Sequence, residues 1–252
     1  MRKRYDFTKS LIKRAGAFLL SHRAERRNVF DKSANDYVTQ ADRECEHLIT
    51  SAIREAFPED GFYCEESGEE NGSSGYTWVI DPIDGTVNFM NSFPLYTISI
   101  ALCRGSEAVM GCVYVPEYDE LFSSLKGEGA FLNEERIHVS SETNMKRSLA
   151  LCVPPHRMHE HLPYYMERYD RVLRAVSDIR SIGSAALSLC YVASGRCSIY
   201  YELGLHAYDF AAGALILTEA GGSFRYERRG EVMYDIKSSS PQFFESLLEM
   251  TR

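Results

Sequence analysis

Apolar residues recur at helical spacing near the start of the chain. Those that define this face are Phe7, Leu11, Ile12, Ala15, Phe18 and Leu19. Spacings of three and four residues place them on one side of a helix, so the pattern predicts an amphipathic helix here. A second helix is predicted from about Gln40 to Ala56, because helical spacing recurs there and Pro58 would interrupt it soon afterwards.

Short β-rich runs follow the second helix. Strands are predicted near residues 62–64 and 77–81, on either side of a polar, glycine-rich loop at 67–75. Three further runs of β-branched and aromatic residues lie at 96–103, 108–116 and 119–125. Turn residues separate these runs, which favours an antiparallel meander.

Strand-like and helix-like segments alternate through the second part of the chain, after the polar segment 140–146. The predicted elements are strands near 147–153, 177–182, 197–202 and 223–227, and helices near 159–168, from about Ser184 and from about Asp209. The pattern predicts one domain over 1–252 that consists of two closely packed halves. These are an α+β half at about 1–145 and an α/β half at about 146–252.

The composition is that of a globular protein, with 252 residues, 44% hydrophobic residues and a formal net charge of −8. Because binding to a nucleic-acid backbone uses clustered positive charge, nucleic acid is not expected as a partner. No apolar stretch is long enough to cross a bilayer or to act as a secretory signal. The seven cysteines are odd in number and form no CxxC pair, so we expect reduced thiols in a soluble, cytoplasmic protein.

Carboxylates stand at the ends of several predicted elements. Glu65 follows one strand, Asp81 and Asp84 follow another, and Asp209 opens a helix. Because element ends converge on a crevice in α/β proteins, these side chains are predicted to lie together. Gathered carboxylates repel one another, and a hard divalent cation such as Mg²⁺ relieves that repulsion through oxygen ligands.

The residues around the two aspartates offer further polar groups. Pro82 has a fixed φ and no N–H, so it makes the bend rigid and leaves the carbonyl of Ile83 as a candidate ligand. Gly85 and Thr86 stand where a helix can start, and N–H groups at a helix start can face an anion. The Thr86 hydroxyl is also a candidate for positioning a water molecule.

Each acidic residue also has a purely structural interpretation. Asp84-Gly85 is a common turn dipeptide, and Asp209 is suited to cap the helix that it opens. Asp42 follows Thr39 by three residues and precedes an apolar run, which is the pattern of a capping box. These interpretations stay open for the single residues, but they explain less well why apolar elements repeatedly end in acids.

Three segments resemble motifs of a known family. WVIDPIDGTVNF at 78–89 and AYDFAAGALILTEAGG at 207–222 are similar to the two signatures of the inositol monophosphatase family, and CEES at 64–67 is similar to its upstream acidic motif. The resemblance extends along nearly the whole chain. It implies a Mg²⁺-dependent, lithium-sensitive phosphatase that forms a homodimer. The implied fold is the α+β, layered α-β-α-β-α sandwich of the inositol monophosphatase and fructose-1,6-bisphosphatase type.

The resemblance assigns roles to individual residues. The implied ligands of two Mg²⁺ ions, with a third ion left open, are Glu65, Asp81, the carbonyl of Ile83, Asp84 and Asp209. Glu65 and Thr86 would activate the attacking water, and Asp42 would hold the Thr86 hydroxyl. The implied substrate-binding residues are Asp84, Gly85, Thr86, Gly183, Ser184, Ala185, Glu202 and Asp209. Among these, Glu202 would bind a sugar or inositol hydroxyl.

The substrate that the resemblance favours is inositol 1-phosphate, because Val-Asn-Phe after DGT is the form found in inositol monophosphatase-like members. A fructose-1,6-bisphosphatase or dual-specificity sugar phosphatase is the nearest alternative. A regulatory protein associated with RNA polymerase or RNA is an alternative of another class. Cys64 stands where the family has glycine and is expected to crowd the loop slightly, and Tyr208 stands where it has tryptophan. The segment 153–163, VPPHRMHEHLP, matches no pattern that we can interpret.

Overall fold

The computed structural model describes residues 1–23, 29–33 and 36–252, and the side chains of 1–23 and 39–252. Its helices are α1 (Arg2–Ser21), α2 (Gln40–Ala56), α3 (Thr86–Met90), α4 (Leu162–Ala175), α5 (Ala185–Ala193), α6 (Ala207–Glu219) and α7 (Phe244–Met250). In the described part of the chain, no helix combines the length and the apolar content that crossing a bilayer requires.

Most strands belong to two sheets. The larger sheet has the order β10-β9-β8-β7-β6-β5-β3-β4 and contains β3 (Gly61–Cys64), β4 (Gly68–Glu70), β5 (Tyr76–Asp84), β6 (Thr97–Arg104), β7 (Glu107–Val115), β8 (Glu120–Leu125), β9 (Gly129–Leu132) and β10 (Glu135–Ile137). The smaller sheet has the order β12-β11-β13-β15-β14 and contains β11 (Leu149–Val153), β12 (Asp178–Arg180), β13 (Ile199–Leu205), β14 (Ser223–Arg229) and β15 (Met233–Ser239). A separate hairpin pairs β1 (Val29–Ser33) with β2 (Asp36–Thr39).

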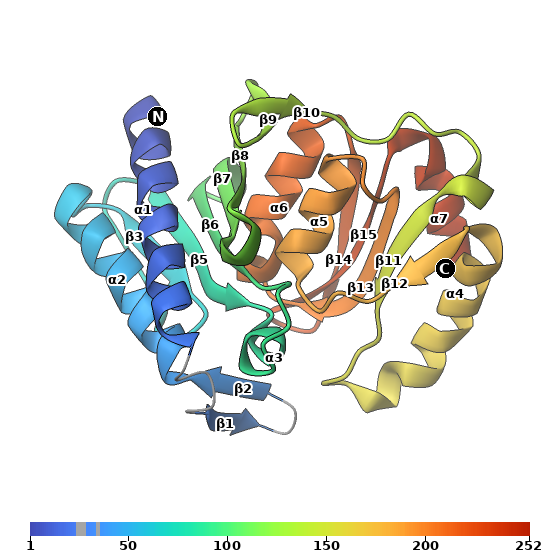
Figure 1. The fold of residues 1–252 in the computed structure, drawn as a ribbon, viewed down its shortest axis with the longest axis horizontal. Coiled ribbons are helices and arrows are strands. Elements are labelled where there is room, and N and C mark those ends of the chain that lie inside the picture. The colour runs from blue at the N-terminus through green and yellow to red at the C-terminus, as the bar shows by residue number, and fades with distance from the viewer. Residues whose placement is uncertain (24–28, 34–35) are drawn as a thin grey trace.

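Helices and sheets alternate in layers (Figure 1). Helices α1 and α2 cover the outer face of the larger sheet, α5 and α6 lie between the sheets, and α4 and α7 cover the outer face of the smaller sheet. The buried apolar residues form three clusters, one under α1 and α2, one around α5 and α6, and one under α4 and α7. The layered α+β sandwich expected from the sequence is therefore confirmed.

Strand β5 is buried on both faces and is thereby held rigid. Trp78 and Ile80 belong to the cluster under α1 and α2, whereas Val79 between them belongs to the central cluster. Successive side chains of a strand point to opposite faces, so an unbroken apolar run fits a strand between two helical layers. Each such side chain contributes about 1.5–3 kcal/mol when fully buried. This packing fixes the position of Asp81, which follows directly.

Several predicted elements have the expected bounds. Helix α2 is found where the sequence predicts it, because Thr39 and Asp42 form a capping box at its start. The runs that correspond to β6, β7 and β8 are adjacent antiparallel strands, so the meander is confirmed.

Other elements differ from the prediction. Strand β5 continues to Asp84 instead of ending at residue 81, because β6 still pairs with it beyond Pro82. Helix α6 begins at Ala207 rather than at Asp209. Helix α4 begins at Leu162 and extends to Ala175, and neither β15 nor α7 was predicted.

Candidate metal centre and active site

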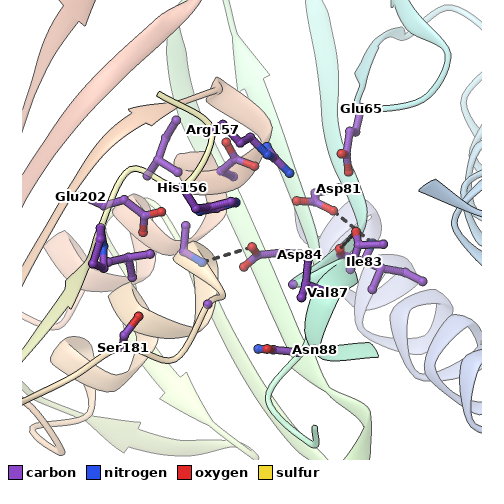
Figure 2. A pocket seen from close by; sticks show the side chains of 18 of the residues that line it. Glu65, Asp81, Ile83, Asp84, Val87, Asn88, His156, Arg157, Ser181 and Glu202 are labelled. Atoms are coloured by element: carbon purple, nitrogen blue, oxygen red, sulfur yellow. Dashed lines mark hydrogen bonds between the residues drawn. The ribbon is translucent and has the colours of Figure 1, made fainter. Parts of the chain in front are cut away.

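A pocket of about 640 Å³ opens between the larger and the smaller sheet (Figure 2). Its walls come from the end of β5 and the start of α3, from β13, from the N-terminal ends of α5 and α6, and from the segment that follows β11. Glu65, Asp81, Asp84 and Asp209 all line it, so the carboxylates that were predicted to lie together do so.

A β-bulge in β5 directs both of its aspartates to the pocket. Residues three apart in a regular strand point to opposite faces. Between the pairing positions of Asp81 and Asp84, however, β5 carries one residue more than β6. Pro82 lies in this extra stretch, where its missing N–H costs no bond between strands. The N–H of Ile83 donates to Asp81 Oδ1 at 3.0 Å and stabilises the bend.

Asp84 links the larger sheet to the start of α5. Its Oδ2 accepts hydrogen bonds from Ser184 Oγ at 2.6 Å and from the N–H of Ala186 at 2.7 Å. Its Oδ1 accepts one from the N–H of Ala185 at 3.1 Å. A helix N-terminus favours negative charge, so α5 helps to keep this buried carboxyl ionised.

Asp209 lies in the first turn of α6. Its Oδ2 accepts the N–H of His206 at 2.5 Å, and the two residues form a capping box. Asp209 is therefore not the N-cap residue, which is His206, but the third residue of the helix and its partner in the capping box, and the same side chain lines the pocket. A capping role and a place among the gathered carboxylates do not exclude each other.

The gathered carboxylates are electrostatically unfavourable without a counter-ion. Oxygens of Asp81, Asp84 and Asp209 lie within 4.8 Å of one another. Burial raises the pKa of Asp81 well above its usual range, and the charges of Glu65, Asp84 and Asp209 raise it further. Burial and neighbouring charge raise the pKa of Asp209 in the same way. Burial also raises the pKa of Asp84, although its hydrogen bonds at α5 oppose this. Buried oxygens that repel one another fit a hard divalent cation such as Mg²⁺.

Glu46, a buried acid of α2, stabilises the loop that carries Glu65. The N–H of Glu65 donates to the carbonyl of Ile80 at 3.1 Å, which places Glu65 beside β5. The carboxylate of Glu46 accepts the N–H groups of Glu66 and Ser67, both at 2.9 Å. The sequence analysis missed Glu46. The available signal was an acid beside Cys45 on the face of α2 that packs against the sheet.

Thr86 is fixed by Asp42, which has two functions at once. Thr86 Oγ1 lies 3.2 Å from Asp42 Oδ1 and 3.1 Å from the carbonyl oxygen of Ile83. The other oxygen of Asp42 accepts the N–H of Thr39 at 2.8 Å, within the capping box of α2. A hydroxyl has one proton to donate, so when Thr86 donates it to Asp42 its lone pairs can accept a hydrogen bond in the pocket.

Glu202 of β13 lies across the pocket from Glu65 (Figure 2). The Tyr200 hydroxyl donates to Glu202 Oε2 at 2.5 Å. Burial raises the pKa of Glu202 to about 8, although this hydrogen bond lowers it in part. A carboxyl that can both donate and accept hydrogen bonds at neutral pH matches the hydroxyl groups of a polyol.

Two glycines let backbone segments meet at the pocket wall. Gly85 and Gly183 have φ values of 98° and 67°, which side chains disfavour. A Cβ on Gly85 would also lie only 3.0 Å from the carbonyl oxygen of Gly183. Gly85, Gly183 and Ala185 line the pocket, whereas Ser184 is buried behind the wall, where it supports Asp84.

Some lining residues were not foreseen. His156, Arg157 and His159 follow β11 and belong to the segment for which the sequence suggested no interpretation. The run of histidine and arginine was the available signal there. Ser181 and Asn88 also line the pocket, and Asn88 Nδ2 donates to the carbonyl of Ile182 at 2.7 Å.

Cys64 and Tyr208, the two residues that depart from the family motifs, lie in different surroundings. Cys64 lies in the apolar cluster under α1 and α2, where burial raises the pKa of its thiol to about 12. The Ser67 hydroxyl of the loop that carries Glu65 is a hydrogen-bond partner of this thiol, and the expected crowding of the loop stays a prediction. Tyr208 packs on the His206 ring with 5.0 Å between the ring centroids.

These observations define a class of protein, namely a layered α+β fold with a group of carboxylates between its two sheets that could hold a divalent cation. The profile of the inositol monophosphatase family matches residues 1–239. An inositol-1-monophosphatase of Mesorhizobium japonicum is 40% identical over 205 residues, which make up 81% of this chain and 77% of that protein. The Nus factor SuhB of Pasteurella multocida is 40% identical over 192 residues, 76% of this chain and 72% of that protein.

A solved structure agrees with these sequence comparisons. The extragenic suppressor protein suhB from Bartonella henselae superimposes with a TM-score of 0.93 at 33% identity, over 98% of this chain and 97% of that chain. The chain therefore belongs to the inositol monophosphatase family, a family of Mg²⁺-dependent phosphatases, as its sequence motifs indicated.

Proposed function

We propose that this protein is an inositol-1-monophosphatase, which hydrolyses inositol 1-phosphate to inositol and phosphate through direct attack of water. The observation that carries the proposal is one pocket in which Glu65, Asp81, Asp84 and Asp209 gather beside the Thr86 hydroxyl. The name of the Mesorhizobium relative supports the choice of substrate.

The proposed metal ligands are oxygens that line the pocket. Glu65, Asp81 and the Ile83 carbonyl would hold one Mg²⁺, and Asp81, Asp84 and Asp209 would hold a second, with a third ion left open. Bound Mg²⁺ lowers the pKa of the attacking water and neutralises charge on the leaving oxygen. The four carboxylates, two of which are positioned by the bulge in β5, would determine where these ions lie.

The remaining proposed roles belong to groups of the chain itself. Glu65 and Thr86 would orient the attacking water and take its proton, and Asp42 would keep the Thr86 lone pairs directed at that water. Proton transfer by a positioned group typically raises a reaction rate about 10²–10⁴-fold.

Substrate binding is proposed to use both walls of the pocket. The phosphate would lie against Asp84, Asp209 and the metal ions, with hydrogen bonds from the backbone at Gly85 and Thr86. The wall formed by Gly183 and Ala185 would lie beside it, and Ser184, which was expected to bind substrate, would act from behind this wall through Asp84. On the opposite side Glu202 would bind hydroxyl groups of the alcohol.

Replacing Thr86 with valine is expected to lower kcat by about 10²-fold or more, because the shape is kept and the proton acceptor is lost. Thr86→Ser keeps the hydroxyl and should retain most of the rate. Steady-state kinetics at saturating Mg²⁺ measures both variants. Equal kcat for Thr86→Val and the wild type would rule out a role for this hydroxyl in water activation.

Glu46→Gln is expected to weaken Mg²⁺ binding about 10-fold or more, because an amide has one oxygen to accept the two N–H groups that the carboxylate holds. The Mg²⁺ concentration at half-maximal activity and calorimetric titration both report this change. Glu55→Gln is the matched control, since Glu55 is an exposed acid of the same helix. An unchanged Mg²⁺ affinity in Glu46→Gln would show that the loop needs no support from α2.

A panel of phosphate esters tests the proposed substrate. Phosphate release would be measured from inositol 1-phosphate, fructose 1,6-bisphosphate, phosphoadenosine phosphate and histidinol phosphate, each with Mg²⁺ and with a chelator. We expect inositol 1-phosphate to be the best substrate among them. Preference for another ester would leave the phosphatase assignment intact and replace the substrate.

A regulatory role in transcription is the second candidate, because the Pasteurella relative is named a Nus factor. RNA binding measured against salt concentration tests it, since contacts to phosphates weaken steeply with salt. Salt-sensitive RNA binding by a protein without phosphatase activity would favour this candidate.

We further propose that the protein acts as a homodimer in the cytoplasm. All seven cysteines are free and buried, which is the expected state in a reducing compartment. Sedimentation equilibrium of the purified protein gives its oligomeric state directly, and a monomeric mass would contradict the dimer.

A further inference from the structure

Tyr200 lies on the same face of β13 as Glu202, on the side of the central apolar cluster. Tyr200 is fully buried in that cluster, whereas Tyr201 belongs to the cluster under α4 and α7. Successive side chains of a strand point to opposite faces, so Tyr200 and Glu202 point to the same one. The strand therefore places a phenol directly beside the carboxyl group that lines the active-site pocket.

The backbone of β13 holds both residues in a fixed register. The strand lies inside the smaller sheet, between β11 and β15. Tyr200 and Glu202 are each paired with both neighbours, and the regular register with β15 ends at Glu202. Because the backbone is held on both sides, the direction of the Glu202 carboxyl depends on its side-chain torsions and on the groups that hold its oxygens.

Tyr200 holds one of the two oxygens of Glu202. The Tyr200 hydroxyl donates to Oε2 at 2.5 Å, and within the described part of the chain Oε1 has no hydrogen-bond partner. Burial raises the pKa of Tyr200 well above its usual value, and the charge of Glu202 raises it further, so the phenol keeps its proton and remains a donor. Because Glu202 lines the pocket, Oε1 is the oxygen left for a ligand (Figure 2).

An oxygen held in this way favours alcohols that carry hydroxyl groups. A carboxyl group whose direction is set before binding loses less conformational entropy when a hydroxyl of the substrate bonds to it. Glu202 is buried, so an alcohol without a hydroxyl at this position would leave the carboxyl group unpaired and away from water. Sites built to bind a substrate hydroxyl discriminate strongly against analogues that lack it.

We propose that Tyr200 is a specificity-determining residue, which holds Glu202 so that Oε1 faces the pocket and thereby selects phosphate esters of polyols over esters of alcohols without further hydroxyl groups. The inference rests on the proposed function and extends it, because it names a residue on which recognition of the inositol hydroxyls depends. Tyr200 does not line the pocket. It is a positioning residue that acts through Glu202, and the attack of water on the phosphate does not use it.

Inositol 1-phosphate and cyclohexyl phosphate form the matched pair of substrates, because both have a six-membered carbon ring and only the first carries free hydroxyl groups. The readout is the ratio of kcat/KM for inositol 1-phosphate to kcat/KM for cyclohexyl phosphate at saturating Mg²⁺. A hydrogen bond to a carboxylate predicts a ratio of about 10 or more in the wild-type protein.

Tyr200→Phe removes the hydroxyl and keeps the buried ring. It is expected to lower the ratio about 5- to 10-fold, which corresponds to the loss of one hydrogen bond to a charged group. The change should be a higher KM for inositol 1-phosphate, while kcat for this ester and both constants for cyclohexyl phosphate stay as in the wild type. Unchanged hydrolysis of cyclohexyl phosphate also shows that the variant is folded.

Tyr201→Phe is the matched control on the same strand. Its hydroxyl is buried on the opposite face and has no hydrogen-bond partner among the described residues, so its removal should leave the ratio unchanged. A double-mutant cycle with Glu202→Ala then tests the route of the effect. In the Glu202→Ala background, Tyr200→Phe should not change the ratio further, and losses that add would contradict an action through Glu202.

The outcomes separate this inference from the proposed function. A wild-type ratio near one, or an equal loss of kcat/KM for both esters in Tyr200→Phe, would overturn the inference while the phosphatase stands. The second of these results would make Tyr200 a residue of the core only. If the wild-type protein hydrolyses neither ester with Mg²⁺, or only cyclohexyl phosphate, the proposed function fails and the inference fails with it.

Discussion

Asp81→Asn is expected to lower Mg²⁺-dependent phosphatase activity by at least about 10³-fold, which corresponds to about 4 kcal/mol in activation free energy. Asp81 stands at the centre of the acidic group, since the charges of Glu65, Asp84 and Asp209 all act on its carboxyl. Asparagine keeps the shape and can still accept the Ile83 N–H through its amide oxygen. The loss therefore reports the missing charge and metal ligand, which are worth several kcal/mol in such sites.

The same substitution is expected to stabilise the protein in the absence of metal. Removing one negative charge from a buried group of carboxyls relieves repulsion, so the thermal midpoint in a chelator should rise. Asp170→Asn serves as the control, because Asp170 is exposed and pairs with Arg174 on α4. A variant that retains activity within a few-fold, or that loses stability without metal, would contradict the central place of Asp81.

Stability without Mg²⁺ is expected to fall as the pH rises from 5 to 8. The pKa values of Asp81, Asp84 and Asp209 are raised by burial, so the folded state holds protons that the unfolded state releases above about pH 4. When the folded state binds more protons, the free energy of unfolding decreases with pH until the raised pKa values are passed. Glu202, whose pKa burial raises to about 8, acts in the same direction.

The size of this effect follows from general values. Each unit by which a pKa is raised costs about 1.4 kcal/mol once the group is ionised, and each kcal/mol lowers the thermal midpoint by about 2–4 °C in a chain of this length. We therefore expect a measurable drop of the midpoint in a chelator between pH 5 and 8. Mg²⁺ should remove most of the drop, because it binds the ionised carboxylates of the folded state.

Thermal unfolding followed by circular dichroism, with chelator or with Mg²⁺ at each pH, measures this behaviour. Asp209→Asn should flatten the pH dependence in the chelator, since one of the groups with a raised pKa is gone. A midpoint in the chelator that is constant or rises over this pH range would show that the carboxyls are not held together as the structure has them.

Much of the fold could be predicted because local signals agreed with the tertiary structure. The Thr39–Asp42 capping box and Pro58 frame α2, and the alternating apolar residues of β6 and β7 fit a sheet with helices on one face and the second half on the other. Strand β15 lacked such a signal. Its run MYDIKSS has few apolar residues, and it is a strand because it pairs with β13 and β14 on both sides.

The predicted end of β5, at residue 81, was wrong for a physical reason. Pro82 and two carboxylates indicate the end of a strand, but a bulge accommodates the proline while β6 keeps pairing up to Asp84. The alternatives posed for Asp42 and Asp209 were likewise not exclusive. Each belongs to the capping box of a helix that starts at the site. Asp42 also accepts a hydrogen bond from the Thr86 hydroxyl, and Asp209 also lines the pocket.

Residues that act through others were the hardest to foresee. Glu46 supports the Glu65 loop from a helix distant in sequence, and Ser184 donates to Asp84 from the other half of the chain. Such contacts depend on how elements pack, which residue spacing does not encode. The segment with His156 and Arg157 follows no family motif, and only its position in the fold brings it to the pocket.

The most direct test of the account is phosphate release from inositol 1-phosphate by the purified protein, with Mg²⁺ and with a chelator, beside the Asp84→Asn variant. Asparagine removes one negative charge from the gathered carboxylates, and its NH2 group would face either the N–H of Ala185 or the donors Ser184 Oγ and Ala186 N–H, so this site should lose its ion. We expect turnover that requires Mg²⁺ and is absent in the variant. Turnover that persists in the chelator or in Asp84→Asn would contradict a metal centre at the gathered carboxylates.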